Sequence, residues 1–382
     1  MNIQLLNKIA AVGINELGEG YNVGENVANP DGIMVRSAVM HEMAFNPELK
    51  AIARAGAGVN NIPIDRCSAE GIVVFNTPGA NANGVKELAI CALLLAARDV
   101  VGGIDWAKTL TEDVAKQVEK GKSKFGGTEI KGKTLGVIGL GAIGGLIANA
   151  AVHLGMKVIG CDPFLSVEGA WNLDNQVCRA ATYDEIYEKA DYITLHVPAT
   201  KDTKNMICTE SIAKMKDGVK IINLSRADLV NAAELKAAIE AGKVSTYVTD
   251  FPTEEVINVP HIVAIPHLGA STEESEDNCA VMAARELDDY LKNGNIKNSV
   301  NFPMVVMPRS GAARICVLHA NVPAVLTQIT AALSGEGINI ENMTNKSKGD
   351  NAYTVVDVAA VPSEAAVAAI NAVEGVVRVR VI

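Results

Sequence analysis

The stretch from Leu135 to Asp162 constrains the fold more than any other part of the chain. It opens with an apolar, β-rich run and then reaches three glycines with the spacing G-x-G-x-x-G. These glycines are Gly139, Gly141 and Gly144. An Ala-rich segment follows, and a second apolar run, Lys157–Gly160, leads to Asp162. This order predicts a strand, a tight turn, a helix and a second strand.

Such a unit is suited to binding a dinucleotide. The first glycine permits the tight turn, the second lets backbone approach a pyrophosphate, and the third lets helix and strand pack closely. The N–H groups at the start of the helix then face the phosphates. Asp162 stands where a carboxylate accepts hydrogen bonds from the ribose hydroxyls and repels a 2′-phosphate, so we expect NAD rather than NADP. Glycine-rich turns also serve ordinary strand-to-helix packing, and it is the flanking strands and the terminal acid that favour the dinucleotide.

Length and composition limit the classes of protein to which the chain can belong. A chain of 382 residues exceeds what one core usually supports, so two or three domains are expected. The net charge of −10 argues against nucleic-acid partners and anionic membrane surfaces. The longest apolar run, Leu88–Ala97, is too short to span a bilayer, and no signal-peptide pattern is present, which predicts a cytoplasmic protein. The seven cysteines are scattered without a C-x-x-C pair, so neither a metal site nor a disulfide framework is predicted.

The order of the elements predicts an α/β fold with three domains. Short strands alternate with helices at both ends of the glycine unit, which indicates two doubly wound parallel sheets. We expect a substrate-binding domain from residues 1–88 and 269–300, and a Rossmann domain from residues 89–268. Single long helices are predicted at Val85–Gly102 and Ser271–Leu291, and a linker at Pro303–Pro308. Residues 312–382 have the β-α-β-β-α-β order of a ferredoxin-like unit, interpreted as a separate module.

Polar side chains follow several predicted strands. Three segments after the glycine unit each end a strand with a chemically capable residue, and they are Asn223–Arg226, Asp250–Glu254 and Pro266–Thr272. Any one of them could be a surface group, but together they supply a general base, an orienting acid and an anion anchor. In the first domain, loops containing Arg36-Ser37, Gly56–Gly58 and Asn76–Asn81 follow strands in the same way.

This series of segments, in this order, resembles the D-2-hydroxyacid dehydrogenases, in particular members that carry a C-terminal ACT regulatory domain. The resemblance implies oxidation of D-3-phosphoglycerate to 3-phosphohydroxypyruvate with NAD, the first step of phosphorylated serine biosynthesis. Reduction of hydroxypyruvate, glyoxylate or another 2-ketoacid is the alternative within enzymes, and an NAD-sensing interaction protein is the alternative outside them. The resemblance also implies a homodimer or homotetramer.

By the same resemblance, Arg226, Glu254 and His267 are the catalytic residues, with His267 as the base and Glu254 fixing its tautomer. The implied cofactor contacts are Gly139, Gly141, Ala142, Ile143, Gly144, Asp162, His196, Val197, Pro198, Thr203, Leu224, Ser225, Arg226, Asp250, His267, Gly269 and Ala270. The implied substrate contacts are Arg36, Ser37, Gly58 and Asn81.

The C-terminal module resembles a serine-binding regulatory domain. His319, Asn321 and Asn339 are its implied effector contacts, with L-serine as the effector. Ala324 stands where such domains usually have glycine, which predicts weakened or absent inhibition. Because every predicted catalytic residue precedes the module, a chain truncated near Met307 is expected to keep its activity.

Overall fold

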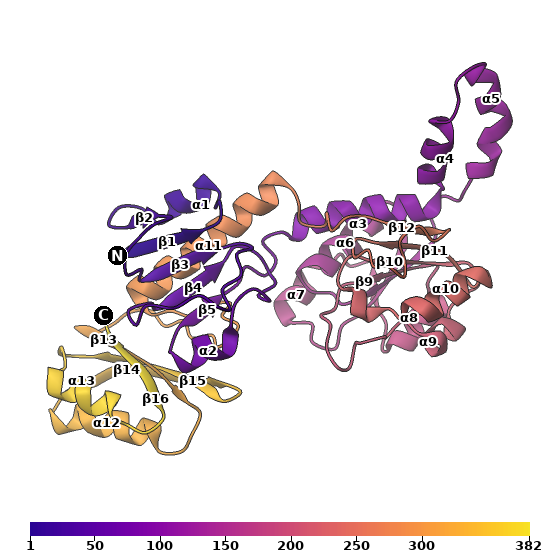
Figure 1. Ribbon diagram of the computed structural model, residues 1–382. Helices are drawn as coiled ribbons and strands as arrows, with labels where there is room; N and C mark the ends of the chain where they lie inside the picture. The colour runs from indigo at the N-terminus through magenta and orange to yellow at the C-terminus, as the bar shows by residue number, and fades with distance from the viewer. The chain divides into compact units, whose positions relative to one another are not determined.

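The computed structural model describes residues Met1–Ile382, which form two compact units. The first unit combines Met1–Ala80 with Glu276–Ile382, and the second is Asn81–Ser275. The first contains a five-stranded and a four-stranded sheet, and the second a seven-stranded sheet (Figure 1). The α/β class, with two parallel sheets and a smaller antiparallel one, is as predicted from the sequence.

The second unit is built on a parallel sheet with the strand order β12-β11-β10-β9-β6-β7-β8. The strands are β6 (Thr134–Ile138), β7 (Lys157–Cys161), β8 (Val177–Arg179), β9 (Tyr192–Leu195), β10 (Val219–Asn223), β11 (Val244–Thr249) and β12 (Ile262–Ala264). From β6 the chain builds outward to β8 and then returns to the other side of β6 at β9. Ligands of such sheets bind beyond the carboxyl ends of the two strands at this reversal.

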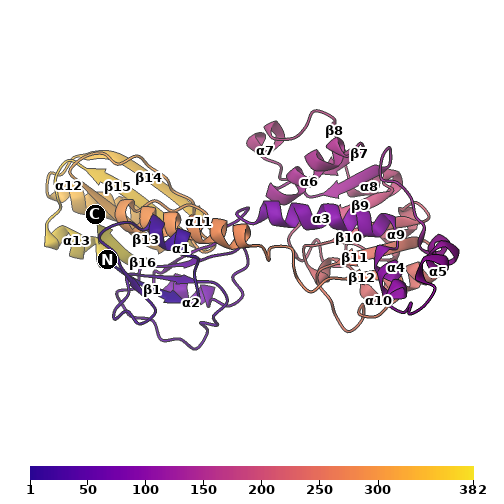
Figure 2. The same cartoon turned by 90° about the horizontal axis from the view of Figure 1, so that it is seen from above.

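Helices cover both faces of this sheet, which explains why its strands are nearly continuous apolar runs. One face packs on α3 (Ala82–Ala97) and α6 (Ala142–His153), as Figure 2 shows from above. The other face packs on α8 (Tyr183–Lys189), α9 (Thr209–Lys214) and α10 (Ala232–Glu240). The short helix α7 (Val167–Trp171) lies between β7 and β8.

The predicted helix Val85–Gly102 is broken. Helix α3 ends at Ala97, and α4 (Val100–Ala107) begins after Asp99, whose Oδ1 accepts a hydrogen bond of 3.0 Å from the Gly102 N–H. This is an N-cap, which satisfies a free N–H of the new helix and so favours a restart at this point. Helix α5 (Val114–Gly121) and the 3₁₀ turn η1 (Lys122–Phe125) follow, and the rings of Trp106 and Phe125 lie 5.3 Å apart.

The first unit begins with a parallel sheet in the order β2-β1-β3-β4-β5. Its strands are β1 (Asn2–Leu6), β2 (Asn22–Gly24), β3 (Gly32–Val35), β4 (Ala51–Arg54) and β5 (Val73–Phe75). Side chains of α1 (Ala11–Glu16) and of α11 (Glu273–Asn293) join the core on one face. Helix α2 (Ile64–Ala69) contributes to the core on the other.

The C-terminal sheet is antiparallel, in the order β14-β15-β13-β16. It consists of β13 (Ala313–Ala320), α12 (Val325–Gly335), β14 (Ile340–Lys348), β15 (Asn351–Val358), α13 (Glu364–Asn371) and β16 (Val376–Val381). The predicted β-α-β-β-α-β order is therefore present. Ile315, Val317 and Val356 form a core with the two helices on one face of the sheet.

The opposite face of this sheet packs on the rest of the first unit, and the division of residues 312–382 into a separate module stays a prediction. Cys316, Leu318 and Tyr353 belong to the same hydrophobic core as α11 and β1. The Tyr353 hydroxyl donates to the Gly294 carbonyl, and Arg380 Nη2 donates to the Leu291 carbonyl at 2.8 Å. The predicted linker is part of the packed structure too, because Val305 pairs with Ile296 and Met307 is buried in this core. Strands β13 and β15 thus bury apolar side chains on both faces. The face opposite the two helices joins the C-terminal sheet to the five-stranded sheet.

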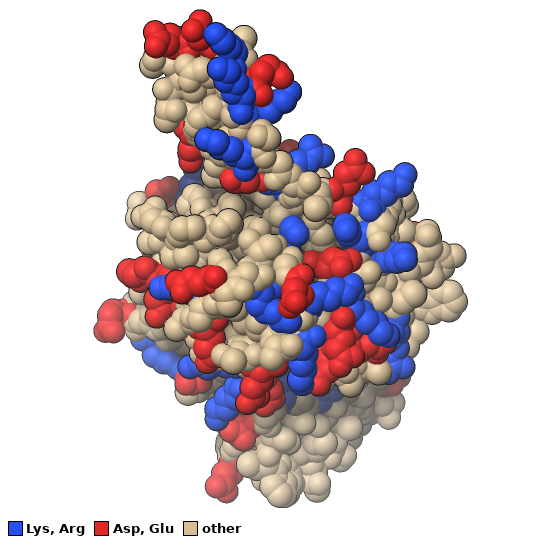
Figure 3. All heavy atoms as spheres, turned by 90° about the vertical axis from the view of Figure 1, so that its right-hand side faces the viewer, with Lys and Arg blue, Asp and Glu red and all other residues tan.

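No helix is long and apolar enough to cross a membrane. On the face of the molecule in Figure 3, basic and acidic side chains alternate, and neither sign gathers into a single large patch.

Candidate active site

The glycine turn between β6 and α6 is closely packed on one side and open on the other. Gly139 has a φ of +90°, and a side chain there would meet the His196 carbonyl. A methyl group at Gly144 would overlap the Gly139 carbonyl. At Gly141, which begins α6, an added Cβ would meet no atom within 4 Å. The first and third glycines therefore let the turn fold, and the second leaves backbone open to a ligand, a geometry that fits a dinucleotide pyrophosphate.

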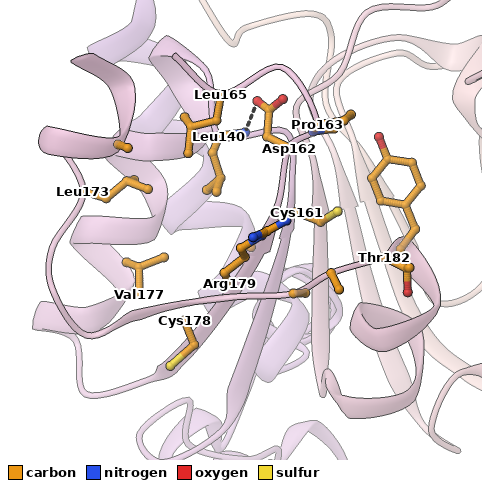
Figure 4. A pocket seen from close by; sticks show the side chains of 15 residues that line it. Leu140, Cys161, Asp162, Pro163, Leu165, Leu173, Val177, Cys178, Arg179 and Thr182 are labelled. Atoms are coloured by element: carbon orange, nitrogen blue, oxygen red, sulfur yellow. Dashed lines mark hydrogen bonds between the residues drawn. The ribbon is translucent and has the colours of Figure 1, made fainter. Parts of the chain in front are cut away.

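Asp162 is held against this turn. Its Oδ2 accepts a hydrogen bond of 2.9 Å from the Leu140 N–H, and its Oδ1 accepts one of 2.8 Å from the Phe164 N–H. Each oxygen keeps a lone pair for a further donor such as a ribose hydroxyl. Figure 4 shows Asp162 at the edge of a pocket of about 880 Å³, with Arg179 in the same pocket and the apolar side chain of Leu173 on another wall. The role of Asp162 as the ribose-binding acid stays a prediction.

His196 lies at the end of β9, on the opposite side of the turn. Its Nε2 lies 2.7 Å from the Thr194 hydroxyl, whereas its Nδ1 is buried without a partner. Burial lowers the pKa of His196 to about 3, so the ring is neutral at physiological pH. The side chain packs at the strand end, and its carbonyl closes on Gly139.

The other predicted cofactor contacts after β9 and β10 brace their own loops. Thr203 Oγ1 donates to the Pro198 carbonyl at 2.6 Å, and the Thr200 N–H donates to Thr203 Oγ1 at 2.8 Å. The Ser225 hydroxyl donates to the Leu195 carbonyl at 2.6 Å, which joins the loop after β10 to the end of β9. These loops border the reversal point of the sheet, where the fold places a ligand.

The backbone of Arg226 is fixed by a buried asparagine. Asn223 Oδ1 accepts from the N–H groups of Ser225 and Arg226, and its Nδ2 donates to the Arg226 carbonyl at 2.8 Å. The Arg226 side chain is exposed, and its Nη1 donates to the Ser225 carbonyl. Its guanidinium carbon lies 5.8 Å from the centre of the Phe251 ring. A planar donor group is thus presented to solvent beside an aromatic ring.

His267 is held in an uncommon conformation. Its φ of +45° is left-handed, which is rare outside glycine and concentrates at functional sites. Its N–H donates to the Asp250 carbonyl at 3.0 Å, and its imidazole lies 4.7 Å from the Phe251 ring, centre to centre. Phe251 therefore contacts His267 and also lies near Arg226, and the sequence did not single it out. Its place inside the segment Asp250–Glu254, directly after the predicted acid, is the signal that would have identified it.

The structure places Asp250, rather than Glu254, in the electrostatic surroundings of His267. Asp250 is buried, its Oδ2 accepts from the Gly269 N–H at 3.0 Å, and its Oδ1 has no partner. Burial raises the pKa of Asp250, against the opposing effects of the Gly269 N–H, His267 and Arg226. Glu254 is exposed in the turn after Thr253 and forms no hydrogen bond with His267. Its assignment as the orienting acid stays a prediction.

The predicted substrate residues of the first unit form a charged group at the ends of β3 and β4. Arg36 Nη2 lies 2.6 Å from Glu276 Oε1, and Arg54 Nε donates to the Arg36 carbonyl at 3.1 Å. Gly56 has a φ of +145°, and any side chain there would overlap the Arg54 guanidinium. The Ser37 N–H donates to Asn7 Oδ1 at 3.0 Å. Glu276 was not predicted, because it lies in the first turn of α11, far from these loops in the sequence.

Two other predicted substrate contacts, Asn81 and Gly58, lie in different units of the structure. Asn81 begins α3 in the second unit, and Gly58 lies in the loop after β4. No group of three His, Cys, Asp or Glu side chains is arranged as metal ligands.

The predicted effector turn begins at His319. This residue is buried, with Nδ1 2.8 Å from the Ala320 carbonyl and Nε2 2.8 Å from the Thr354 hydroxyl. Both ring nitrogens are engaged inside the sheet, and the role of His319 as an effector contact stays a prediction. Asn321 and Asn339 are exposed. Ala324 has a φ of +69°, which explains why glycine suits this position.

Comparison with known proteins places the nucleotide-binding segment in a known family. Residues 92–269 match the family described as "D-isomer specific 2-hydroxyacid dehydrogenase, NAD binding domain". D-3-phosphoglycerate dehydrogenase of Synechocystis is 35% identical over 315 residues, which cover 79% of this chain and 54% of that protein. D-3-phosphoglycerate dehydrogenase 2 of Saccharomyces cerevisiae is 30% identical over 402 residues, covering 94% of this chain and 82% of that one. The chain spans about half the length of several of the relatives it matches.

Solved structures agree with this placement. NAD⁺-bound 3-phosphoglycerate dehydrogenase of Entamoeba histolytica has a TM-score of 0.62 and 30% identity, covering 80% of this chain and 99% of that one. D-mandelate dehydrogenase of Rhodotorula graminis has a TM-score of 0.69 at 23% identity, covering 81% and 99%. The second likeness concerns the fold alone.

Proposed function

This chain belongs to the D-2-hydroxyacid dehydrogenase family, and we propose that it oxidises D-3-phosphoglycerate to 3-phosphohydroxypyruvate with NAD. The observation that carries the proposal is the conformation of His267, which is left-handed and held against Phe251, a ring that also lies near Arg226. This group follows the strands of the NAD-binding sheet. Relatives that carry the name D-3-phosphoglycerate dehydrogenase and are 30–36% identical support the choice of substrate.

The chemistry divides between the cofactor and the side chains that follow β10, β11 and β12. NAD, when bound, supplies the carbon that accepts the hydride. The His267 imidazole takes the proton of the substrate hydroxyl, and Phe251 restricts the plane in which the ring can lie. Arg226 offers a planar pair of donors to the substrate carboxylate. Asp250 places a buried carboxyl group in the electrostatic surroundings of this imidazole. In this proposal Glu254 remains the family's orienting acid, a role that its exposed position leaves to be tested.

We assign the cofactor to the open side of the glycine turn. Gly141 would admit the pyrophosphate at the start of α6, and Asp162 would accept the ribose hydroxyls with its remaining lone pairs. His196, Val197, Pro198 and Thr203 would contribute the loop after β9. A second negative charge at a 2′-phosphate would face the Asp162 carboxylate, so NAD is preferred over NADP.

We assign the substrate phosphate to the first unit. Arg36 and Arg54 bring two guanidinium groups to the ends of adjacent strands, a pattern suited to a dianionic phosphate. Ser37 and Gly58 are the other residues of this unit that the family resemblance implies, and Asn81 of the second unit is implied by that resemblance alone.

For the C-terminal sheet we propose a regulatory role in a homodimer or homotetramer. Of the predicted serine contacts, Asn321 and Asn339 expose polar side chains, whereas His319 is engaged internally. Ala324 and the internal hydrogen bonds of the His319 ring both favour weak serine binding.

The test is a comparison of substrates. Formation of NADH on addition of D-3-phosphoglycerate, at a higher kcat/KM than with D-glycerate or D-lactate and at a higher kcat/KM with NAD than with NADP, is the expected result. Faster turnover of glycerate or of a 2-ketoacid would instead assign the chain to the reductases of this family. Binding of NAD without turnover of any hydroxy acid would indicate a sensor.

A further inference from the structure

A second pocket, of about 590 Å³, lies within the first unit beside α11. Its walls come from one side of α11, from the loop Asn295–Asn298 and from Ala80. Val281 and Met282 give it an apolar wall, and most of the remainder is lined by four charged side chains and three asparagines. None of these residues has a part in the proposed oxidation.

Glu286 is the unusual member of this lining. The residue is 7% exposed, and its Oε1 accepts a hydrogen bond of 2.6 Å from Asn298 Nδ2. Its Oε2 is buried and has no hydrogen-bond partner. Burial raises the pKa of Glu286 to about 7, against the opposing effects of the Asn298 bond and of Lys297. Burial of a carboxylate oxygen without a hydrogen-bond donor costs free energy. A ligand that donates a hydrogen bond to Glu286 Oε2 therefore gains more binding free energy than it would from a solvated carboxylate.

The charges around Glu286 define what such a group would be. Arg285 is engaged by Glu16, through contacts of 2.8 and 3.1 Å, and is not available as that donor. Asp289 accepts from Asn293 and Asn295. Lys297 is exposed at the pocket, near enough to Glu286 to affect its pKa, and forms no ion pair. The pocket therefore has an unsatisfied anion in its wall and a cation without an ionic partner at its edge.

We propose that this pocket binds a small zwitterionic amino acid, with its ammonium group on Glu286 Oε2 and its carboxylate towards Lys297. An ammonium group has three donors and no acceptor, which suits a carboxylate oxygen that lacks a donor. The amino-acid side chain then lies against Val281 and Met282. This site is distinct from the effector turn near Asn321, which belongs to the C-terminal sheet.

Isothermal titration calorimetry of the full chain at about pH 8, where Glu286 is ionised, tests the proposal. The probes are L-alanine and L-methionine, with ethylamine as an ammonium without a carboxylate and propionate as a carboxylate without an ammonium. At least one amino acid should bind roughly tenfold more tightly than ethylamine, and propionate should not bind. No binding of either amino acid would overturn the proposal.

Variants locate the site. Glu286→Gln keeps the size and packing of the side chain but replaces the acceptor by an amide, and should weaken the amino acid by about tenfold or more. Lys297→Met should weaken the binding of the amino acid and leave the affinity for ethylamine unchanged. Glu274→Gln, exposed on the same helix, and Asn321→Ala, at the effector turn, should change neither. Unaltered affinity in Glu286→Gln, or loss of binding in Asn321→Ala, would refute the assignment.

Proton release provides a measurement that does not depend on a variant. Near pH 6, Glu286 is mostly protonated, and an incoming ammonium should displace its proton. The other charged groups here are Arg285, Asp289 and Glu16, together with Lys297 on the loop. Binding enthalpies in buffers of different ionisation enthalpy should show release of a proton on binding, which should disappear at about pH 8.5 and in Glu286→Gln. Absence of release near pH 6 would exclude Glu286 as the partner of the ammonium.

Discussion

Replacement of Arg314 by methionine tests how firmly the C-terminal sheet belongs to the first unit. Arg314 and Asp357 are both fully buried, and their paired contacts measure 2.6 and 2.8 Å. The same guanidinium donates to the carbonyls of Asn293 and Pro308, at 2.8 and 3.0 Å. One side chain thus connects β15 to the end of α11 and to the segment that precedes β13.

The magnitude follows from these contacts. Two unit charges 2.6 Å apart attract by about 6 kcal/mol at an effective dielectric constant near 20, most of which offsets the cost of burying them. Removal of one partner leaves Asp357 buried with donors from Ser310 only, and it leaves two carbonyls without a donor. The expected loss is about 3–5 kcal/mol in the free energy of unfolding.

The assay is urea unfolding of the full chain near neutral pH, in which the free energy of unfolding of the first unit is measured. Lys292→Met, which removes a partly exposed ion pair with Asp288 in the same unit, is the control and should cost less than about 1 kcal/mol. The double variant Arg314→Met/Asp357→Leu should recover part of the loss, because it leaves no unpaired buried charge. A loss below about 1 kcal/mol in Arg314→Met, or a double variant as unstable as the sum of the two single changes, would refute the reasoning.

The pH dependence has a definite sign. Burial alone would raise the pKa of Asp357, but hydrogen bonds from Arg314 and Ser310 outweigh it and hold the pKa below its ordinary value. The stabilisation is therefore present above the pKa of an unfolded aspartate and is lost as the pH falls below about 4. Arg314→Met should lose this part of the acid sensitivity.

The same contacts change the expectation for a truncated chain. Ending the chain near Met307 removes Cys316, Leu318 and Tyr353 from the core that they share with α11. Burial of a large apolar side chain is worth roughly 1.5–3 kcal/mol, and a whole domain is stable by only about 5–15 kcal/mol. The first unit should therefore not fold stably in that truncation, although every proposed catalytic residue is retained.

Four further predictions follow from single sites. His267→Ala should lower kcat by about 10²–10⁴ with NAD affinity largely kept, and near-normal turnover in steady-state assays would exclude His267 as the base. Glu276→Gln should lower the KM for D-3-phosphoglycerate by about threefold without changing kcat, because Arg36 loses a competing anion; an unchanged KM would remove Arg36 from the phosphate site. Ala324→Gly should raise the free energy of unfolding by about 1 kcal/mol, since the residue is left-handed, and calorimetry that shows destabilisation would contradict this. The raised pKa of Glu286 means that stability falls as the pH rises from about 4.5 to 7, so Glu286→Gln should gain about 2–3 kcal/mol at pH above 7 and flatten that slope in urea unfolding.

The sequence predicted the elements whose pattern is local. The turn at Gly139 and Gly144 needs glycine for steric reasons that the spacing reveals directly, and the left-handed backbone at Ala324 agrees with the glycine usual there. The break between α3 and α4 was missed, because the apolar pattern continues through it and only the Asp99 cap marks the restart. Strands β1 and β2 were not identified individually, since few of their residues are buried and neither shows a clear apolar alternation.

The parts of the site that escaped prediction depend on contacts between distant segments. Glu276 lies 240 positions after Arg36, and only the return of α11 to the first sheet brings them together. Phe251 stands next to the predicted acid, but nothing local shows that its ring contacts His267. His319 is a residue type that could bind an effector, but the sequence does not show that its Nε2 lies 2.8 Å from the hydroxyl of Thr354 on the neighbouring strand.

Helix α11 connects these observations. Its first turn carries Glu276, which is paired with Arg36 at the proposed phosphate site. Its last turns present the carbonyls of Tyr290 and Leu291, which accept hydrogen bonds from Arg380 of β16. A helix of 21 residues is about 30 Å long, so α11 joins the proposed phosphate site to the C-terminal sheet through one continuous element. The packing of β16 on the end of this helix is the reason why removal of the C-terminal sheet is expected to destabilise the first unit.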